Sequence, residues 1–167
     1  MKKLLKSIYQ FFLTVYIFES YSKFGKINKD GISIFFAKSA NKAKKNKIIK
    51  KYFERNEFKL ERFKKKSQFI GLKRRDEIIC SGWIYFGNKW KIEEINKNIV
   101  LKNQHLLYDF ITEKKFRNLG YYKLLLKIIQ NKFKTKRLII YSLSHNIKSI
   151  RAIQKVGFEL TEKLKRY

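Results

Sequence analysis

The sequence lacks proline altogether and contains one cysteine and two histidines in 167 residues. Cys80 has no cysteine partner, so the chain cannot form an intramolecular disulfide or a zinc site built on cysteine thiolates. His105 and His145 come without a cluster of carboxylates, and two histidines alone do not make a metal site. We therefore predict a protein without a bound metal, located in the reducing environment of the cytoplasm.

Acidic residues are also scarce. Only 13 Asp and Glu residues oppose 41 Lys and Arg residues, which gives a formal net charge of +28. A positive field of this size attracts nucleic acid, anionic lipid and phosphorylated small molecules. The sequence is also rich in Lys, Ile, Asn, Phe and Tyr, as A/T-rich codons would produce. The charge therefore has two interpretations, a surface that binds polyanions or a drift in composition.

The apolar run near the N-terminus is too short to cross a membrane. It extends from Ile8 to Phe18, which is 11 residues, whereas a membrane-spanning helix needs about 20. Glu19 follows it, and no small-x-small cleavage site of a signal peptide is present. The run is either a helix or strand that packs on the core, or an aromatic and basic anchor at an anionic membrane surface.

The hydrophobic fraction of 44% is enough for one buried core in a chain of this length. This fraction excludes a disordered tail and a disulfide-stabilised miniprotein, and the sequence shows no linker and no internal repeat. We predict that residues 1–31 form an N-terminal aromatic and basic segment, packed on the core or on the membrane surface. Residues 32–167 then form the main domain.

Strand and helix patterns alternate in the C-terminal part of the chain. Leu106–Thr112 and Leu138–Leu143 are nearly continuous apolar runs, typical of strands covered on both faces. Between them apolar residues recur at helical spacing from 119 to 133, and a second helix spans Asn146 to Gly157. This order predicts an α/β fold with a mixed, partly parallel central sheet flanked by helices. The other predicted elements are strands at 32–36, 68–72, 78–86 and 92–95, a strand beginning at Phe158, and a basic helical stretch over 38–58.

The segment from Lys114 to Tyr122 joins a predicted strand to a predicted helix. Backbone N–H groups in the first turn of a helix have no helical acceptor, and the helix dipole adds positive charge, so a phosphate fits there. Gly120 allows a close approach of the backbone, and Arg117 adds a counter-charge. Between residues 114 and 158 the chain has 12 basic residues and no acidic one. We expect this half of the molecule to face an anion; the alternative is a plain strand–helix connection with solvated lysines.

Three motifs follow one another in this region: Arg117-x-x-Gly120-x-Tyr122, Asn146-x-x-Ser149 and Gly157-Phe158. Their order and spacing resemble the GNAT superfamily of acyl-CoA-dependent N-acetyltransferases. In that family the first motif opens a long helix whose backbone amides hold the pyrophosphate of coenzyme A. The surrounding sequence is most similar to members found in bacterial surface-polysaccharide gene clusters.

The resemblance implies a GNAT-like fold that transfers an acetyl group from acetyl-CoA, the co-substrate, to a primary amine by direct attack in a ternary complex. It implies an amino-sugar acceptor, free or carried on a nucleotide diphosphate or a lipid. The aromatic and basic N-terminus would keep such a cytoplasmic enzyme near the inner membrane face. The implied coenzyme-binding residues are Ile111, Thr112, Arg117, Asn118, Leu119, Gly120, Tyr121, Tyr122, Asn146 and Ser149, with Lys148 and Arg151 near the adenosine phosphates. Asn146 is also predicted to cap its helix.

Three departures from the family pattern accompany the resemblance. Tyr122 replaces a small residue, so its side chain must point away from the phosphates or alter their contacts. Ile153 stands where many members have a tyrosine that protonates the departing thiolate, and Tyr141 and Ser144 are the alternatives for that role. Only ten residues follow Gly157, so we predict a short or incomplete C-terminal hairpin.

Asp109 is the predicted general base, because an acid within an apolar strand is placed to accept a proton. The alternative is a strand-edge position or a structural pair with a lysine. Glu93 and Glu94 are predicted on a short strand near the acceptor. They would bind a cationic amine, act as the base, or lie solvated.

Two other functions stay open at this stage. One is a nucleic-acid- or ribosome-associated binding protein that uses its charge on phosphates. Its aromatic residues, however, occupy apolar periodic positions, and no motif that reads nucleic acid is present. The other is a GNAT-fold protein that binds a coenzyme or peptide without catalysis.

Overall fold

The structure is a computed structural model that describes residues 13–20 and 31–166. Its elements follow one another along the chain as β1 Thr14–Ser20, β2 Ser33–Ala37, α2 Ala40–Lys45, α3 Lys47–Glu54, the 3-10 helix η1 Glu57–Phe63, β3 Ser67–Arg74, β4 Glu77–Tyr85, β5 Lys89–Ile92, β6 Lys97–Val100, β7 Gln104–Thr112, the short η2 Lys114–Phe116, α4 Tyr121–Lys132, β8 Arg137–Leu143, α5 Ile147–Gln154 and β9 Glu159–Lys165.

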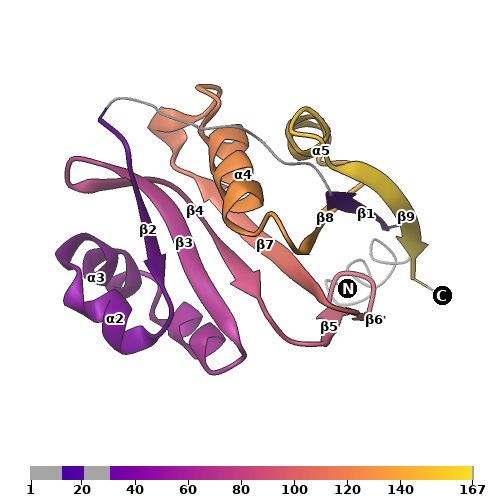
Figure 1. Cartoon of the computed structure of the whole chain (residues 1–167), viewed down its shortest axis with the longest axis horizontal. Helices are drawn as coiled ribbons and strands as arrows, with labels where there is room; N and C mark the ends of the chain where they lie inside the picture. Colours follow the sequence, from indigo (N-terminus) through magenta and orange to yellow (C-terminus); the bar gives the residue numbers. More distant parts are fainter. Residues whose placement is uncertain (1–12, 21–30, 167) are drawn as a thin grey trace, which may run out of the picture.

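Seven of the strands form one sheet in the order β2-β3-β4-β7-β8-β1-β9 (Figure 1). Neighbouring strands are antiparallel except β7 and β8, which run parallel because α4 crosses back between them. The predicted α/β fold with a mixed, partly parallel sheet is therefore confirmed. β5 and β6 form a separate hairpin.

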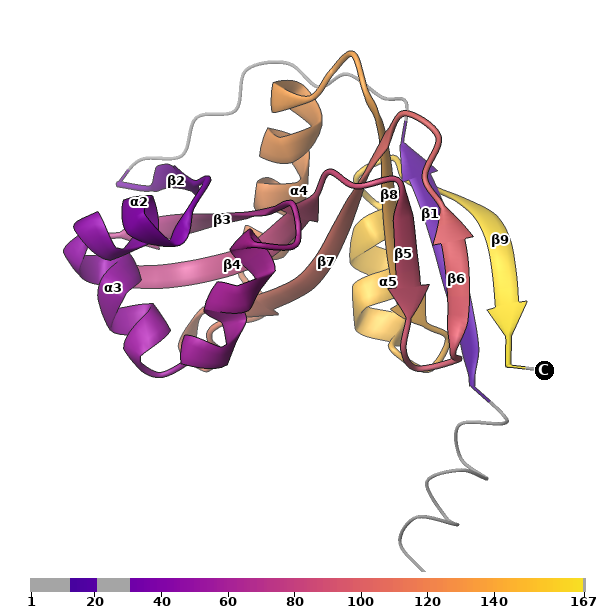
Figure 2. The same ribbon diagram turned by 90° about the horizontal axis from the view of Figure 1, so that it is seen from below.

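Both faces of the sheet are covered (Figure 2). α4 and α5 pack on one face, where residues such as Ile70, Leu125 and Ile153 share a buried cluster. α2, α3 and η1 pack on the other face, against residues such as Phe69 and Trp83. Phe69 and Ile70 lie on opposite faces because successive side chains of a strand alternate. The β5–β6 hairpin covers that second face beside β1 and β8.

The first strand of the chain, β1, lies between β8 and the last strand, β9. Val15 pairs with Leu143 on one side and with Leu164 on the other. Val15 and Phe18 are fully buried. The predicted short C-terminal hairpin is confirmed, since β9 is the single strand after α5 in the described part of the chain, and β1 supplies its neighbour.

Part of the N-terminal apolar run, residues 8–12, lies outside the described residues. The division of the chain at residue 31 stays a prediction. Among the residues that the structure describes, no helix is long and apolar enough to span a membrane.

Two predicted elements differ in the structure. The strand expected at 92–95 is wrong: Glu93–Asn96 form the turn of the β5–β6 hairpin, where Asn96 adopts a φ of 54°. Asparagine tolerates this left-handed conformation better than most residues, which places the turn here. The basic stretch over 38–58 divides at Asn46, whose side chain accepts hydrogen bonds from the amides of Ile48 and Ile49 and so begins a new helix, α3.

His105 on β7 gives the fold a testable pH dependence. Its ring lies 4.6 Å from the ring of Phe86 and 5.4 Å from that of Phe133, and burial lowers the pKa of this imidazole below its ordinary value of 6.5. The imidazole of His105 then binds a proton more readily in the unfolded chain than in the folded chain. Its protonation therefore lowers the free energy of unfolding as the pH falls below the unfolded pKa. We expect the free energy of unfolding in urea to fall less between pH 7 and 5 for His105→Phe than for the unaltered chain. Equal losses in the two proteins would contradict this assignment.

Candidate active site

The parallel strands β7 and β8 separate part of the way along their length. Their pairing runs from Gln104 opposite Arg137 to Leu107 opposite Ile140 and then stops. Tyr108 of β7 and Tyr141 of β8 are the first residues beyond the paired part. In an open α/β sheet, ligands gather where neighbouring strands part at their carboxyl ends.

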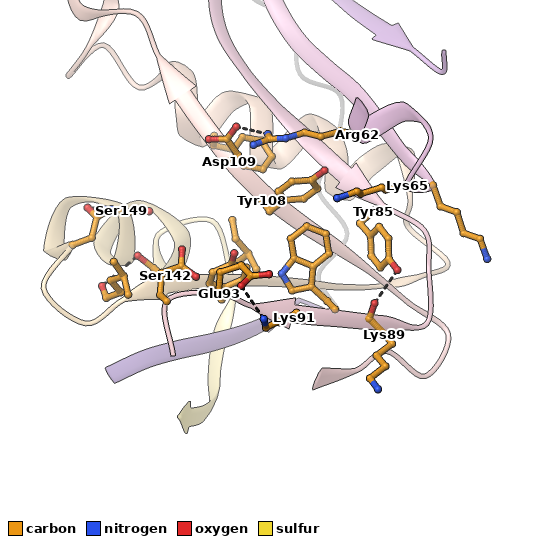
Figure 3. A pocket seen from close by; sticks show the side chains of 18 of the residues that line it. Arg62, Lys65, Tyr85, Lys89, Lys91, Glu93, Tyr108, Asp109, Ser142 and Ser149 are labelled. Carbon is orange, nitrogen blue, oxygen red and sulfur yellow. Dashed lines mark hydrogen bonds and ion pairs between the residues drawn. The ribbon is translucent and has the colours of Figure 1, made fainter. Parts of the chain in front are cut away.

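Two cavities meet at this opening. The first, of about 730 Å³, lies at the start of α4 and α5 and is called the helix cavity here. The second, of about 830 Å³, lies between the end of η1, the β5–β6 hairpin, β7 and β8, and is called the hairpin cavity (Figure 3). Phe110, Tyr122, Asn146 and Ser149 line both cavities. A ligand that extends past these four side chains would reach from one cavity into the other.

A bulge in β7 shapes the wall between the cavities. Ser81 pairs with Ile111 and Trp83 with Tyr108, so Asp109 and Phe110 together lie opposite the single residue Gly82. Such a bulge leaves the extra residue outside the regular ladder of hydrogen bonds and bends the strand. An added Cβ on Gly82 would meet the Phe110 ring at 2.5 Å, so only glycine leaves room for that ring.

The loop before α4 has the geometry of an anion site. Asn118 and Gly120 have φ values of 63° and 81°, and left-handed residues of this kind turn successive N–H groups toward one side. The amide of Leu124 makes the first helical bond, to the carbonyl of Gly120. The amides before it therefore lie outside the helical ladder, at the positive end of the helix dipole. Arg117 is fixed beside them, since its Nε donates to the carbonyl of Thr112 at 3.1 Å.

The charges around the helix cavity have one sign. None of the described residues that line it is acidic, and the five basic ones are Arg117, Lys123, Lys148, Arg151 and Lys155. Cations that converge on a concave surface focus the field and attract an anion.

The predicted coenzyme-binding residues gather at this cavity. Those that line it are Ile111, Thr112, Arg117, Asn118, Gly120, Tyr121, Tyr122, Asn146 and Ser149. Leu119 does not line it, and its side chain is exposed on the outside of the loop. Asn146 caps α5 as predicted, because its side-chain oxygen accepts from the amide of Ser149 at 3.3 Å.

Tyr122 points from α4 across to α5. Its ring lies 5.6 Å from that of Phe110, and its hydroxyl lies 3.4 Å from Oγ of Ser149. The bulky side chain thus forms part of the wall that the two cavities share. Burial raises the pKa of the Tyr122 phenol, so it stays protonated at neutral pH.

The position of Ile153, where the resemblance predicts a tyrosine, does not open onto either cavity. Ile153 is fully buried in the core and lines neither cavity, and Ser144 lines neither. Tyr141 lines the hairpin cavity, where burial and the nearby charge of Glu94 raise the pKa of its phenol. Burial also raises the pKa of the Tyr108 phenol, so Tyr108, Tyr122 and Tyr141 are protonated phenols near the opening between the strands.

The structure shows the alternative given for Asp109, a pair with a lysine, in place of purely apolar surroundings. Its carboxylate forms an ion pair with Lys59 at 3.1 Å and a second with Arg62, both from η1. The guanidinium of Arg62 lies over the rings of Trp83 and Tyr108, at 5.4 and 5.3 Å from their centroids. Asp109 thus ties η1 to the bulge of β7 and lines the hairpin cavity.

Replacing Asp109 by asparagine tests this structural contact. The left-handed φ of 50° at this position remains accessible to asparagine, but Lys59, whose side chain is 7% exposed, loses its ion-pair partner. We expect the free energy of unfolding in urea to fall by about 1–3 kcal/mol. Glu61→Gln, which breaks the exposed Lys64–Glu61 pair, should cost less than about 1 kcal/mol. Equal small losses for the two variants would contradict the structural role.

Arg62, Lys59 and the pair of Gly82 with Phe110 are site features that the sequence does not predict. Gly82 carried a signal, because a glycine in the interior of a strand pattern often marks a bulge or a close approach. Arg62 and Lys59 carried none, since they lie just beyond the predicted basic helical stretch over 38–58 and far from Asp109 in the chain.

Cys80 takes no part in the chemistry of the site. It is fully buried, and burial raises the pKa of its thiol to about 12. Thr112 donates a hydrogen bond to its sulfur at 3.2 Å. At pH 8 about one molecule in ten thousand would then carry the thiolate. We expect no reaction of the folded protein with Ellman's reagent and full reaction after unfolding in guanidinium; rapid labelling of the folded protein would contradict this burial.

The comparisons with known proteins bear on this geometry. No protein-family model matches the sequence, and the search of curated proteins found no match. A GNAT-family acetyltransferase structure from Novosphingobium aromaticivorans is similar with a TM-score of 0.61 at 11% identity, over 90% of this chain and 61% of that one. An aminoglycoside acetyltransferase from an uncultured soil metagenomic sample, in complex with trehalose, is similar with a TM-score of 0.56 at 13% identity, over 83% of this chain and 95% of that one.

A GCN5-related N-acetyltransferase-like protein from Streptococcus suis is similar with a TM-score of 0.51 at 11% identity, over 97% of this chain and 64% of that one. The chain thus spans less than two thirds of the Novosphingobium and Streptococcus structures. At these identities the likeness concerns the fold. The chain has a GNAT-like fold.

Proposed function

We propose that the protein is an acyl-CoA-dependent N-acyltransferase that binds acetyl-CoA in the helix cavity and an amine in the hairpin cavity. One observation carries the proposal: the left-handed turn at Gly120 opens α4 onto a cavity lined by cations, and this cavity meets a second one where β7 and β8 separate. The fold supports it, because the solved structures that share it include a GNAT-family acetyltransferase and an aminoglycoside acetyltransferase.

The diphosphate of the coenzyme is assigned to the amides of the turn at Gly120, with the basic residues of the helix cavity around its phosphates. Bound acetyl-CoA supplies the acyl thioester. The thioester end is assigned to the shared wall of the cavities, between the bulge at Phe110 and the side chain of Tyr122. The bulge turns a strand amide out of the sheet ladder, which suits it to stabilise the carbonyl oxygen on which negative charge develops.

The acceptor amine attacks the thioester carbon from the hairpin cavity, the carbon–sulfur bond breaks, and the amine loses a proton. Glu93, Glu94 and Asp109 are the acids that line this cavity. Glu93 is exposed and pairs with Lys91, so the carboxylate of Glu94 or Asp109 would accept that proton directly or through water. Asp109 already holds Lys59 and Arg62, whereas Oε2 of Glu94 has no hydrogen-bond partner among the described residues. We therefore assign Glu94 as the base ahead of Asp109. The protonated phenols of Tyr122 and Tyr141 are placed to give a proton to the leaving thiolate.

An amino-sugar fits the hairpin cavity as acceptor. Aromatic side chains form one side of it, with the ring centroids of Trp90 and Tyr108 4.5 Å apart. The aminoglycoside acetyltransferase that shares the fold holds trehalose, a carbohydrate, in its structure. An acceptor from surface-polysaccharide synthesis, and a place at the inner membrane face, are the narrower form of this proposal and rest on the sequence resemblance.

Release of free thiol from acetyl-CoA in the presence of amino-sugars, polyamines and amino acids tests the proposed function. Turnover that depends on the amine supports it. Stable binding of acetyl-CoA without turnover of any amine identifies a binding protein of this fold. If the protein slows the migration of random RNA in a mobility-shift assay at about 150 mM salt and does not bind acetyl-CoA, it is a nucleic-acid-binding protein.

A further inference from the structure

Charges of opposite sign lie at opposite ends of the hairpin cavity. Lys64, Lys65, Lys66 and Lys89 all line this cavity, and the amide of Phe86, three residues before Lys89, donates to the carbonyl of Lys66 at 3.0 Å. Glu93 and Glu94 follow the other end of β5. The four-residue strand sets Lys89 roughly 13 Å from Glu93. Figure 3 shows Lys65 and Lys89 on one side of the pocket and Glu93 on the other.

Some lysines that line the hairpin cavity are already in ion pairs, and others are not. Lys64 pairs with Glu61 at 2.9 Å and Lys91 with Glu93 at 3.1 Å. Among the described residues, no ion pair engages Lys65, Lys66 or Lys89. Three ammonium groups at the mouth of one cavity match the several oxygens of a phosphate, each of which accepts a charge-assisted hydrogen bond.

The acidic end lacks a donor. Oε2 of Glu94 is buried and accepts no hydrogen bond from the described residues. A buried acceptor without a donor costs free energy, which a bound N–H group would recover. Glu94 lies near Tyr141, at the opening between β7 and β8 through which the acyl group would arrive. This end therefore suits the amine of the acceptor.

Aromatic rings join the two ends. The centroids of Tyr85 and Trp90 are 5.0 Å apart, and those of Trp90 and Tyr108 are 4.5 Å apart. In Figure 3 the side chain of Lys65 reaches over the pocket between Tyr85 and Tyr108. The body of a ligand that spans the cavity would lie against this surface, which suits a sugar ring or an alkyl chain.

We propose that the acceptor is an amine whose far end carries a phosphate group, held by Lys65, Lys66 and Lys89, with the amine at Glu94. The proposal rests on the proposed acyl transfer and adds the chemical class of its acceptor. A phosphate on a sugar and a phosphate within a nucleotide share this chemistry. Polyamines and other polycations are disfavoured, because they would meet the unpaired lysines as like charges.

Matched acceptors test the proposal. 6-Aminohexyl phosphate and 6-aminohexanol differ only in the phosphate, and 2-aminoethyl phosphate keeps the phosphate on a shorter spacer. We expect kcat/KM, measured by thiol release, to be at least about tenfold higher for 6-aminohexyl phosphate than for either of the others. Glucosamine 6-phosphate and UDP-glucosamine, each against glucosamine, then separate a sugar phosphate from a nucleotide as the source of the phosphate.

Two double variants locate the phosphate. Lys65→Met with Lys89→Met should reduce the preference for 6-aminohexyl phosphate to less than about threefold. Lys50→Met with Lys51→Met changes the net charge equally on α3, away from the cavity, and should leave the preference unchanged. Equal or better use of 6-aminohexanol, or an equal loss in both double variants, overturns the proposal.

Calorimetry on the same samples separates this inference from the proposed function. If acetyl-CoA binds but the CoA-saturated protein does not bind 6-aminohexyl phosphate, the acceptor class is wrong while the coenzyme site stands. If acetyl-CoA does not bind to folded protein, the proposed function fails and the acceptor class falls with it.

Discussion

Replacing Gly120 by alanine should weaken the binding of acetyl-CoA by about 10- to 100-fold, the loss expected for one hydrogen bond to a charged group. Gly120 has a φ of 81°, where an L-residue is strained, so the loop changes conformation or holds the strain. The added Cβ would meet nothing closer than 3.9 Å, so crowding inside the protein does not contribute. Titration calorimetry measures the affinity, and the cost in folding stability should be about 1–2 kcal/mol.

Gly31→Ala is the matched control for this prediction. Gly31 has a φ of 72° and an equally open surrounding, with one atom of Arg74 at 3.9 Å, but lies away from both cavities. The Gly31→Ala variant should lose about as much folding stability as the Gly120→Ala variant and keep its affinity for acetyl-CoA. Equal affinities for the Gly120 variant and the unaltered protein would show that the diphosphate does not bind at this turn.

Replacing Gly82 by alanine should disrupt the wall between the two cavities. The new Cβ would lie 2.5 Å from atoms of the Phe110 ring, so the ring must move into the space where the cavities meet. Overpacking of this kind costs about 1–3 kcal/mol of stability, and the displaced ring would obstruct the path between the coenzyme and the amine. We expect a loss of at least about tenfold in kcat/KM together with the lower stability.

A double-mutant cycle checks that the Phe110 ring is the cause. Phe110→Leu alone should cost stability through lost packing, but Gly82→Ala should cost much less in the Phe110→Leu background than alone. Urea unfolding of the four proteins gives the coupling. Additive losses would mean that Gly82 and Phe110 do not determine each other's positions.

The elements that form the helix cavity are those that the sequence predicts best. The start of α4, the cap of α5 at Asn146 and the turn at Gly157 follow from local patterns that act within a few residues. Most of the candidates for coenzyme binding come from the motifs on these elements, and their role stays a prediction. That prediction is possible because each motif sits at a helix end whose geometry is set by its own residues.

The remaining features depend on contacts between distant parts of the chain. The place of β1 beside β9 pairs residues 14–20 with the end of the chain, a choice that no local pattern in either strand encodes. The ion pairs of Asp109 with Lys59 and Arg62 depend on where η1 docks. The sequence therefore offers a pair of Asp109 with a lysine as an alternative, but it does not identify Lys59 or Arg62 as the partners.

Titration calorimetry with acetyl-CoA and with acetyl-pantetheine, which lacks the nucleotide and the diphosphate, tests the central claim most directly. The account predicts that acetyl-CoA binds the folded protein and that acetyl-pantetheine binds at least about 100-fold more weakly, because it cannot reach the turn at Gly120 or the cations of the helix cavity. Equal affinities for the two compounds, or no heat with acetyl-CoA, would contradict it.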